Sequence, residues 1–198
     1  MKTYKIGISP NSTKIISGAY TVLIYDINDK EFKKEIDNHG KYIYSNCFIN
    51  DNILALGNNT GSISLVDLNE YKFTNKIEEH CMPVRCLAYN KSKNVLYSAS
   101  DDLHMNIIDI NSQKVLFTMV GHKNLITNLI ILENKGVLIS SSSDGNIKLW
   151  DISNNQGKLM FDYYNEDNKP IWDMTFDYNQ DILFAIGENF FEAFKLYI

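Results

Sequence analysis

The sequence has 198 residues, enough for one domain with a hydrophobic core, and its formal net charge is −5. This negative balance, with lysines scattered along the chain, disfavours direct nucleic-acid binding, which needs clustered positive charge. The three cysteines, Cys47, Cys81 and Cys86, form no Cys-x-x-Cys pair, so we expect neither a disulfide framework nor a zinc site.

The first residues, Met1–Asn11, lack the apolar core of a signal peptide, and no run approaches the roughly 18 apolar residues of a membrane span. We therefore expect a reducing, intracellular setting, in the cytoplasm, the nucleus or both.

A repeat of 41 to 47 residues runs through the whole sequence. Each copy ends on an apolar or aromatic marker residue, which an aspartate follows in the first four copies. The markers are Tyr25, Val66, Ile108, Trp150 and Tyr197. Alternating apolar residues predict short strands throughout, and no long segment has helical periodicity. The repeat divides the chain into units at 1–38, 39–79, 80–120, 121–164 and 165–198.

The first and second units each contain four predicted strands. In the second unit, Leu56 and Thr60 stand where the fourth unit has a serine and an aspartate. We therefore expect apolar packing to replace a polar network there. The fifth unit has only three predicted strands, so we expect its sheet to lack an outer strand.

The fourth unit has the most informative pattern. It reads Gly-His, a strand, a second strand ending in serine, an Asp-Gly turn, and a third strand ending in Trp-Asp. We predict a buried hydrogen-bonded tetrad of His122, Ser140, Asp144 and Trp150, in which groups that are costly to bury alone satisfy one another. The third unit repeats three members at the same offsets, His80, Ser98 and Asp102, but has Ile108 in place of the tryptophan.

The same residues invite a hydrolase interpretation. Ser140 lies inside a predicted strand and not on an exposed turn, which favours the structural role. We interpret the remaining acidic residues of the pairs Asp101–Asp102 and Glu78–Glu79 as solvated loop charges. We therefore expect no catalytic residue, no metal and no cofactor.

The order of these motifs resembles the WD-repeat family, whose units open on Gly-His and close on Trp-Asp. The resemblance implies an all-β fold, a β-propeller of WD repeats. It would have about five four-stranded antiparallel blades, the last one lacking its outer strand.

A narrower resemblance is to the WD-repeat subunits of Ski (superkiller) complexes, which in animals are shared with the PAF complex. It rests on His80-Cys-Met-Pro-Val-Arg-Cys-Leu-Ala-Tyr89, Ser98–Asp102, Ser140–Asp144 and Ile171–Phe176. The resemblance implies a non-catalytic scaffold that docks on a tetratricopeptide-repeat subunit beside an RNA helicase, in exosome-mediated mRNA decay, or that serves transcription elongation. Alternatives are an adaptor of a ubiquitin ligase or histone-modifying complex, and a propeller hydrolase.

The family implied by this resemblance has seven blades, and the sequence matches about five. We expect two N-terminal blades to be missing, through a truncated gene model, and keep a reduced ring or completion by another chain as alternatives. Both end blades would then expose an apolar face.

Partner-binding residues are expected on the rim of the central channel. Propellers bind partners near the start of each innermost strand, which corresponds here to Tyr44, Arg85, Thr127 and Trp172. Arginine, tryptophan and tyrosine dominate interface hot spots, so we expect Arg85 and Trp172 to anchor a peptide. The alternative is that Tyr44 and Trp172 pack between blades.

Overall fold

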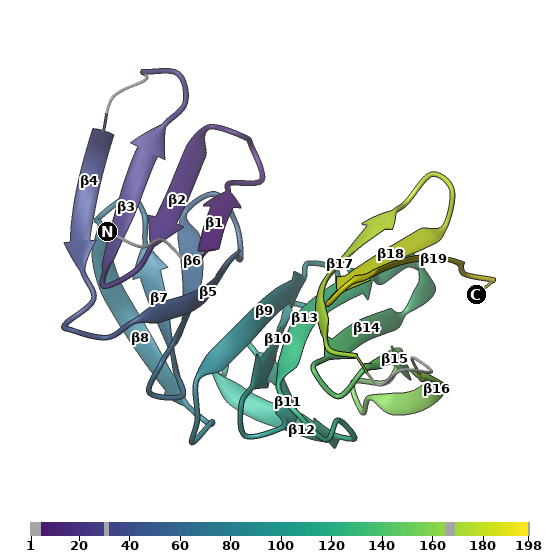
Figure 1. Ribbon diagram of the computed structural model, residues 1–198. Coiled ribbons are helices and arrows are strands. Elements are labelled where there is room, and N and C mark those ends of the chain that lie inside the picture. Colours follow the sequence, from purple (N-terminus) through teal and green to yellow (C-terminus); the bar gives the residue numbers. More distant parts are fainter. Residues whose placement is uncertain (1–4, 30–31, 165–168, 198) are drawn as a thin grey trace.

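The computed structural model describes residues 5–29, 32–164 and 169–197. Its strands form five antiparallel sheets, each built from strands consecutive in the chain (Figure 1). The first sheet contains β1 (Lys5–Ile8), β2 (Lys14–Gly18), β3 (Thr21–Asp26) and β4 (Phe32–Asp37); the second contains β5 (Ile43–Phe48), β6 (Ile53–Asn58), β7 (Ser62–Asp67) and β8 (Lys72–Glu78).

The third sheet contains β9 (Val84–Asn90), β10 (Val95–Ser100), β11 (His104–Asp109) and β12 (Lys114–Val120). The fourth contains β13 (Ile126–Leu132), β14 (Val137–Ser142), β15 (Asn146–Asp151) and β16 (Lys158–Tyr164), with a short 3-10 helix, η1 (Glu133–Lys135), between β13 and β14. The last contains β17 (Ile171–Asp177), β18 (Ile182–Gly187) and β19 (Phe190–Lys195).

The expected all-β architecture is confirmed. Four sheets have four strands, and the fifth has three among the residues described. The sheets follow one another around an arc in Figure 1, with the N-terminal sheet at one end and the C-terminal sheet at the other. The innermost strands β1, β5, β9, β13 and β17 contact one another in sequence order. We call each sheet a blade.

The core lies between neighbouring blades and not within any one of them. Pairing places Ile16 and Ile24 on the same face of the first blade. That face packs against Leu54 and Val66 of the second blade. A single sheet of this kind cannot bury its apolar side chains, so each blade is stable only through its neighbours.

The outward faces of the two end blades are exposed, as expected. On the first blade, Ile6 and Ile8 of β1 are exposed, and on the last, Ile186 of β18 and Phe191 of β19. Phe191 stacks on Phe184 with ring centroids 5.9 Å apart.

The expected apolar replacement in the second blade is wrong. Leu56 is buried in the apolar core, but a different polar network stands beside it. The Asn58 amide donates to the hydroxyls of Ser62 (3.2 Å) and Ser64 (2.9 Å) and accepts from Asn38 (2.9 Å). Asparagine supplies both donors and acceptors, so it satisfies this buried cluster without histidine.

The marker assigned to the fifth unit also needs correction. In the fourth blade Trp150 pairs with Leu138, and in the fifth blade the residue in the same register is Phe194, opposite Leu183. Tyr197 follows the end of β19 and is 89% exposed. The distance in sequence from Trp150 to the marker of the fifth unit is therefore three residues shorter than predicted.

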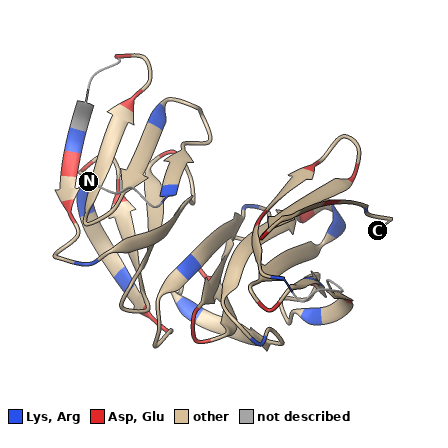
Figure 2. Ribbon diagram, in the orientation of Figure 1, with Lys and Arg blue, Asp and Glu red and all other residues tan. Residues whose placement is uncertain are grey.

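Charged residues are dispersed over the molecule. Figure 2 shows Lys and Arg interspersed with Asp and Glu along the strands and loops of the described chain. Within the described residues, no helix combines the length and the apolar character needed to cross a membrane.

Candidate protein-interaction site

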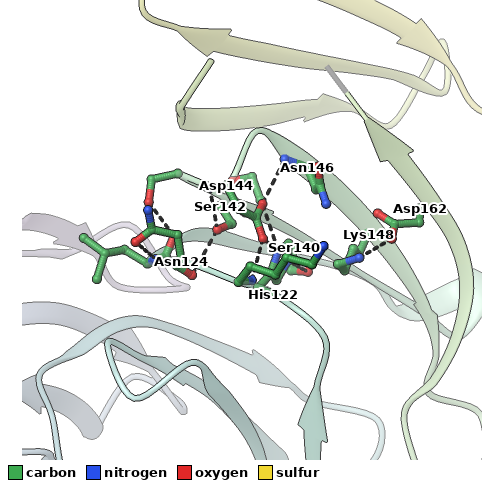
Figure 3. Close-up of polar contacts among 12 residues, drawn as sticks. His122, Asn124, Ser140, Ser142, Asp144, Asn146, Lys148 and Asp162 are labelled. Carbon is green, nitrogen blue, oxygen red and sulfur yellow. Dashed lines mark hydrogen bonds and ion pairs between the residues drawn. The ribbon is translucent and has the colours of Figure 1, made fainter. Parts of the chain in front are cut away.

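The four residues of the predicted tetrad form one hydrogen-bonded chain in the fourth blade. Figure 3 shows three of them, His122, Ser140 and Asp144. His122 Nδ1 lies 3.1 Å from Asp144 Oδ2, and His122 Nε2 lies 2.7 Å from Ser140 Oγ. The indole N–H of Trp150 donates to the same hydroxyl at 2.9 Å. These hydrogen bonds fix the loop before β13 to the β14–β15 turn and to β15.

Asp144 is held in its charged form by this network. Burial pushes its pKa up, but hydrogen bonds from His122 and from the backbone N–H of Lys123 outweigh that effect and lower the pKa to about 2. The Lys123 N–H donates to Asp144 Oδ2 at 2.7 Å. The turn itself is completed by Gly145, whose positive φ of 84° suits glycine.

The third blade contains the shorter network. His80 Nδ1 lies 2.8 Å from Asp102 Oδ2, and His80 Nε2 lies 2.8 Å from Ser98 Oγ. Burial lowers the pKa of His80 more than Asp102 raises it, which keeps the ring neutral near pH 7. Ile108 is buried at the tryptophan position and offers no donor to Ser98.

The His-Ser-Asp trio of the fourth blade is not arranged for nucleophilic attack. Ser140 has no exposed surface, and its hydroxyl is already engaged by His122 and Trp150. A nucleophile must reach a substrate carbonyl, which a fully buried hydroxyl cannot do. The trio is therefore structural.

The four residues predicted to bind partners occupy one equivalent position in four blades. Each is the second residue of an innermost strand, and each is the unpaired residue of a β-bulge. These residues are Tyr44 of β5, Arg85 of β9, Thr127 of β13 and Trp172 of β17. A bulge turns the extra side chain away from the regular pleat, and bulges are enriched where a side chain must be re-aimed.

Hydrogen bonds between blades hold the bulges in place. The carbonyl just before each of three bulges accepts from a side chain of the preceding blade: Ser45 to Val84 (2.9 Å), Cys86 to Ile126 (3.7 Å) and Thr127 to Ile171 (2.8 Å). The starts of the innermost strands are thus tied into a continuous inner rim.

All four bulge residues line a single hollow of about 250 Å³, which we call the central hollow. Lys5 of β1 and Leu125, just before β13, complete its lining. Trp172 is the most open of the four, with 52% of its surface exposed. Sequence reasoning missed Lys5 and Leu125: the first unit shows no motif at Lys5, and Leu125 precedes its strand, outside the strand positions from which the other four were predicted.

Arg85 is positioned by Asp101, to which the sequence analysis assigned a different role. Its guanidinium donates two hydrogen bonds to Asp101, at 2.6 and 2.8 Å, and lies over the ring of Tyr44 at 4.8 Å. The interpretation of Asp101 as a solvated loop charge is wrong, since its side chain is only 6% exposed. Hydrogen bonds to Asp101 raise the pKa of Arg85, so Arg85 presents a fixed, charged plane beside Tyr44.

Thr127 contributes mainly to the scaffold of the hollow. Its hydroxyl bonds Ser141 at 2.9 Å and donates to the Ile171 carbonyl.

Burial raises the pKa of Cys47 and of Cys86 to about 12, so both remain protonated thiols. In the part of the chain that the structure describes, no group of three His, Cys, Asp or Glu side chains is placed to hold a metal ion.

Two family models match the chain. Residues 113–151 match the model "WD domain, G-beta repeat", and residues 44–130 match "Anaphase-promoting complex subunit 4 WD40 domain". The WD repeat-containing protein SL1-17 of Schistosoma mansoni is 34% identical over 103 residues, which make up 50% of this chain and 34% of that protein. The chain therefore spans about one third of the length of this relative.

The sequence matches and the tetrad geometry agree with the blade topology. Proteins built from such repeats are generally protein-interaction scaffolds. The two models, the similar protein and the five antiparallel blades together support the WD40 repeat family for this chain.

Proposed function

We propose that this chain is a non-catalytic scaffold that binds a partner protein at the central hollow. The observation that carries the proposal is the convergence of four bulge residues from four blades on one hollow. Tyr44, Arg85 and Trp172 supply the aromatic and guanidinium surfaces that dominate interface hot spots. The network around Asp101 fixes Arg85 in advance, which reduces the entropy lost on binding.

The side chains indicate the chemistry of the partner. Asp101 neutralises Arg85, whereas Lys5 adds a positive charge to a rim that also carries two aromatic rings. A peptide with an apolar or aromatic residue next to an acidic one complements this surface. Trp172 and the Arg85–Tyr44 pair would contact the apolar residue, and Lys5 the acidic one.

The finer proposal is that the partner set is that of a Ski-type subunit. It would comprise a tetratricopeptide-repeat subunit with its RNA helicase in mRNA decay, or transcription-elongation factors of the PAF complex. The support is the motif likeness of His80–Tyr89 and Ile171–Phe176. The match to a model named for the anaphase-promoting complex makes a subunit of such a complex the second candidate.

Affinity purification of the chain followed by mass spectrometry tests both levels. Recovery of a tetratricopeptide-repeat protein with a helicase, or of polymerase-associated factors, would support the Ski-type role. Recovery of anaphase-promoting complex subunits, or of another ubiquitin-ligase or histone-modifying set, would replace it. Recovery of no partner would contradict the scaffold role itself.

Two matched pairs of variants test the site. Trp172→Ala and Lys5→Ala alter the hollow, whereas Met160→Ala and Lys158→Ala alter the outer strand β16. Met160 is a suitable control because it is also a bulge residue and is 53% exposed. We expect the hollow variants to lose about tenfold or more in partner affinity, and the β16 variants to keep it. Equal affinity of all four variants would place the interface elsewhere.

A further inference from the structure

A second hollow, of about 340 Å³, lies in the third blade beside its shortened tetrad. We call it the blade-3 hollow. Its lining residues are Glu79, Cys81, Asp102, His104, Asn106, Val115 and Thr118. It is separated from the central hollow by the turn after β10, in which Asp101 bonds Arg85 while Asp102 bonds His80.

The blade-3 hollow corresponds to the space that an indole fills in the fourth blade. There, the ring of Trp150 lies against Gly121 so closely that a Cβ on that glycine would come within 2.9 Å of the ring. The Lys148 side chain lies 3.8 Å from the same Cβ position, and Trp150 pairs with Leu159.

In the third blade, the residues at the matching positions are Glu79, Asn106 and Val115. All three line the blade-3 hollow. With Ile108 in place of the tryptophan, this space is open to solvent, and Glu79 places a carboxylate at the position that Gly121 occupies in the fourth blade.

The walls of the blade-3 hollow favour a cation. Glu79 contributes an exposed carboxylate, and Asp102 a second one with its side chain 8% exposed. Burial lowers the pKa of the adjoining His80, so that ring adds no compensating positive charge near pH 7. His104 lies at the mouth, with Nδ1 3.4 Å from Asp102 Oδ1.

We propose that the blade-3 hollow is a recognition pocket for an arginine side chain of a partner protein. A guanidinium is planar and weakly hydrated, so it suits a space that an aromatic ring occupies in the neighbouring blade better than an ammonium does. Its forked N–H groups match the carboxylate of Glu79, and Thr118 and Asn106 provide further polar contacts. The pocket is distinct from the central hollow, and its test does not depend on that site.

The experiment is an amide-resolved NMR titration of the full chain with Nα-acetyl-arginine amide. Nα-acetyl-citrulline amide, which has nearly the same shape and no charge, is the matched control ligand. We expect saturable shifts at the amides of Glu79, His104 and Asn106 with the arginine compound, and binding about tenfold weaker with the citrulline compound. The lysine compound should bind more weakly than the arginine compound.

Three variants complete the test. Glu79→Gln should weaken arginine binding about tenfold, and Glu78→Gln, which changes the neighbouring exposed charge paired with Lys76, should not. The double variant Glu79→Gly with Ile108→Trp should fill the hollow and abolish binding. Equal binding of the arginine and citrulline compounds, or shifts confined to other regions, would overturn the proposal.

Discussion

The central serine of each histidine network, in the third and fourth blades, offers a quantitative test of these networks. In the fourth blade, Ser140 Oγ accepts from Trp150 and bonds His122, whereas in the third blade Ser98 Oγ bonds His80. Replacing Ser140 with alanine removes the partner of two buried polar groups at once. Within the described residues, the indole N–H donates to Ser140 Oγ, so the substitution removes the acceptor that it now uses.

The two substitutions should therefore differ in cost. A buried polar group left without a partner costs about 1–3 kcal/mol, so we expect Ser140→Ala to lose about 3 kcal/mol of unfolding free energy. For Ser98→Ala we expect about 1 kcal/mol, because only His80 is affected and the Asn106 amide already lies 3.4 Å from the same ring nitrogen. Ser143→Ala, in the same serine run, serves as the control, since the one side-chain hydrogen bond that Ser143 makes to a described residue is long, at 3.4 Å.

The measurement is urea unfolding followed by tryptophan fluorescence, with midpoints compared at equal slope so that the variants share one reference state. The expected order of destabilisation is Ser140→Ala, then Ser98→Ala, then Ser143→Ala within about 0.5 kcal/mol of the parent. If Ser140→Ala and Ser98→Ala proved equally destabilising, the argument that the indole depends on Ser140 would be refuted.

Three further predictions concern the same networks. Gly121→Ala should destabilise the chain by about 1–3 kcal/mol in thermal unfolding, because its Cβ would press on the ring of Trp150; an unchanged melting temperature would contradict this. Glu79→Gly with Ile108→Trp should rebuild a full tetrad in the third blade and raise the melting temperature, whereas either change alone should not. The pKa of Asp144 is about 2 in the folded chain and about 3.9 unfolded, so its contribution of about 2 kcal/mol is present above pH 4 and lost as pH falls toward 2. Urea unfolding midpoints measured over a pH series should fall between pH 4 and pH 2 in the parent chain, and this fall should be smaller in Asp144→Asn.

The sequence was a good guide wherever the pattern was local or strictly periodic. It predicted the five sheets and the three-stranded last blade, which the structure confirms. It went wrong in the second blade, because Asn58 forms a polar network that no tetrad motif announces. It also misplaced the fifth marker, because Phe194 and Tyr197 are both aromatic and only strand pairing distinguishes them.

The partner-binding role of Tyr44, Arg85, Thr127 and Trp172 stays a prediction, although the structure brings all four to one hollow. What the sequence could not provide was the reason for their convergence. A bulge is a mismatch between two paired strands, and register does not appear in the residue pattern of one strand alone.

The sequence by itself determined the repeat, the strands and the tetrad, because alternation and the spacing of histidine, serine, aspartate and tryptophan act within about 30 residues. Only the tertiary structure decided what lines the two hollows. Arg85 meets Tyr44 about 40 residues away, and the blade-3 hollow exists because a glycine and a tryptophan are both absent from positions that meet in space. Such contacts are fixed by how one blade packs on the next, where burial and geometry outweigh local pattern.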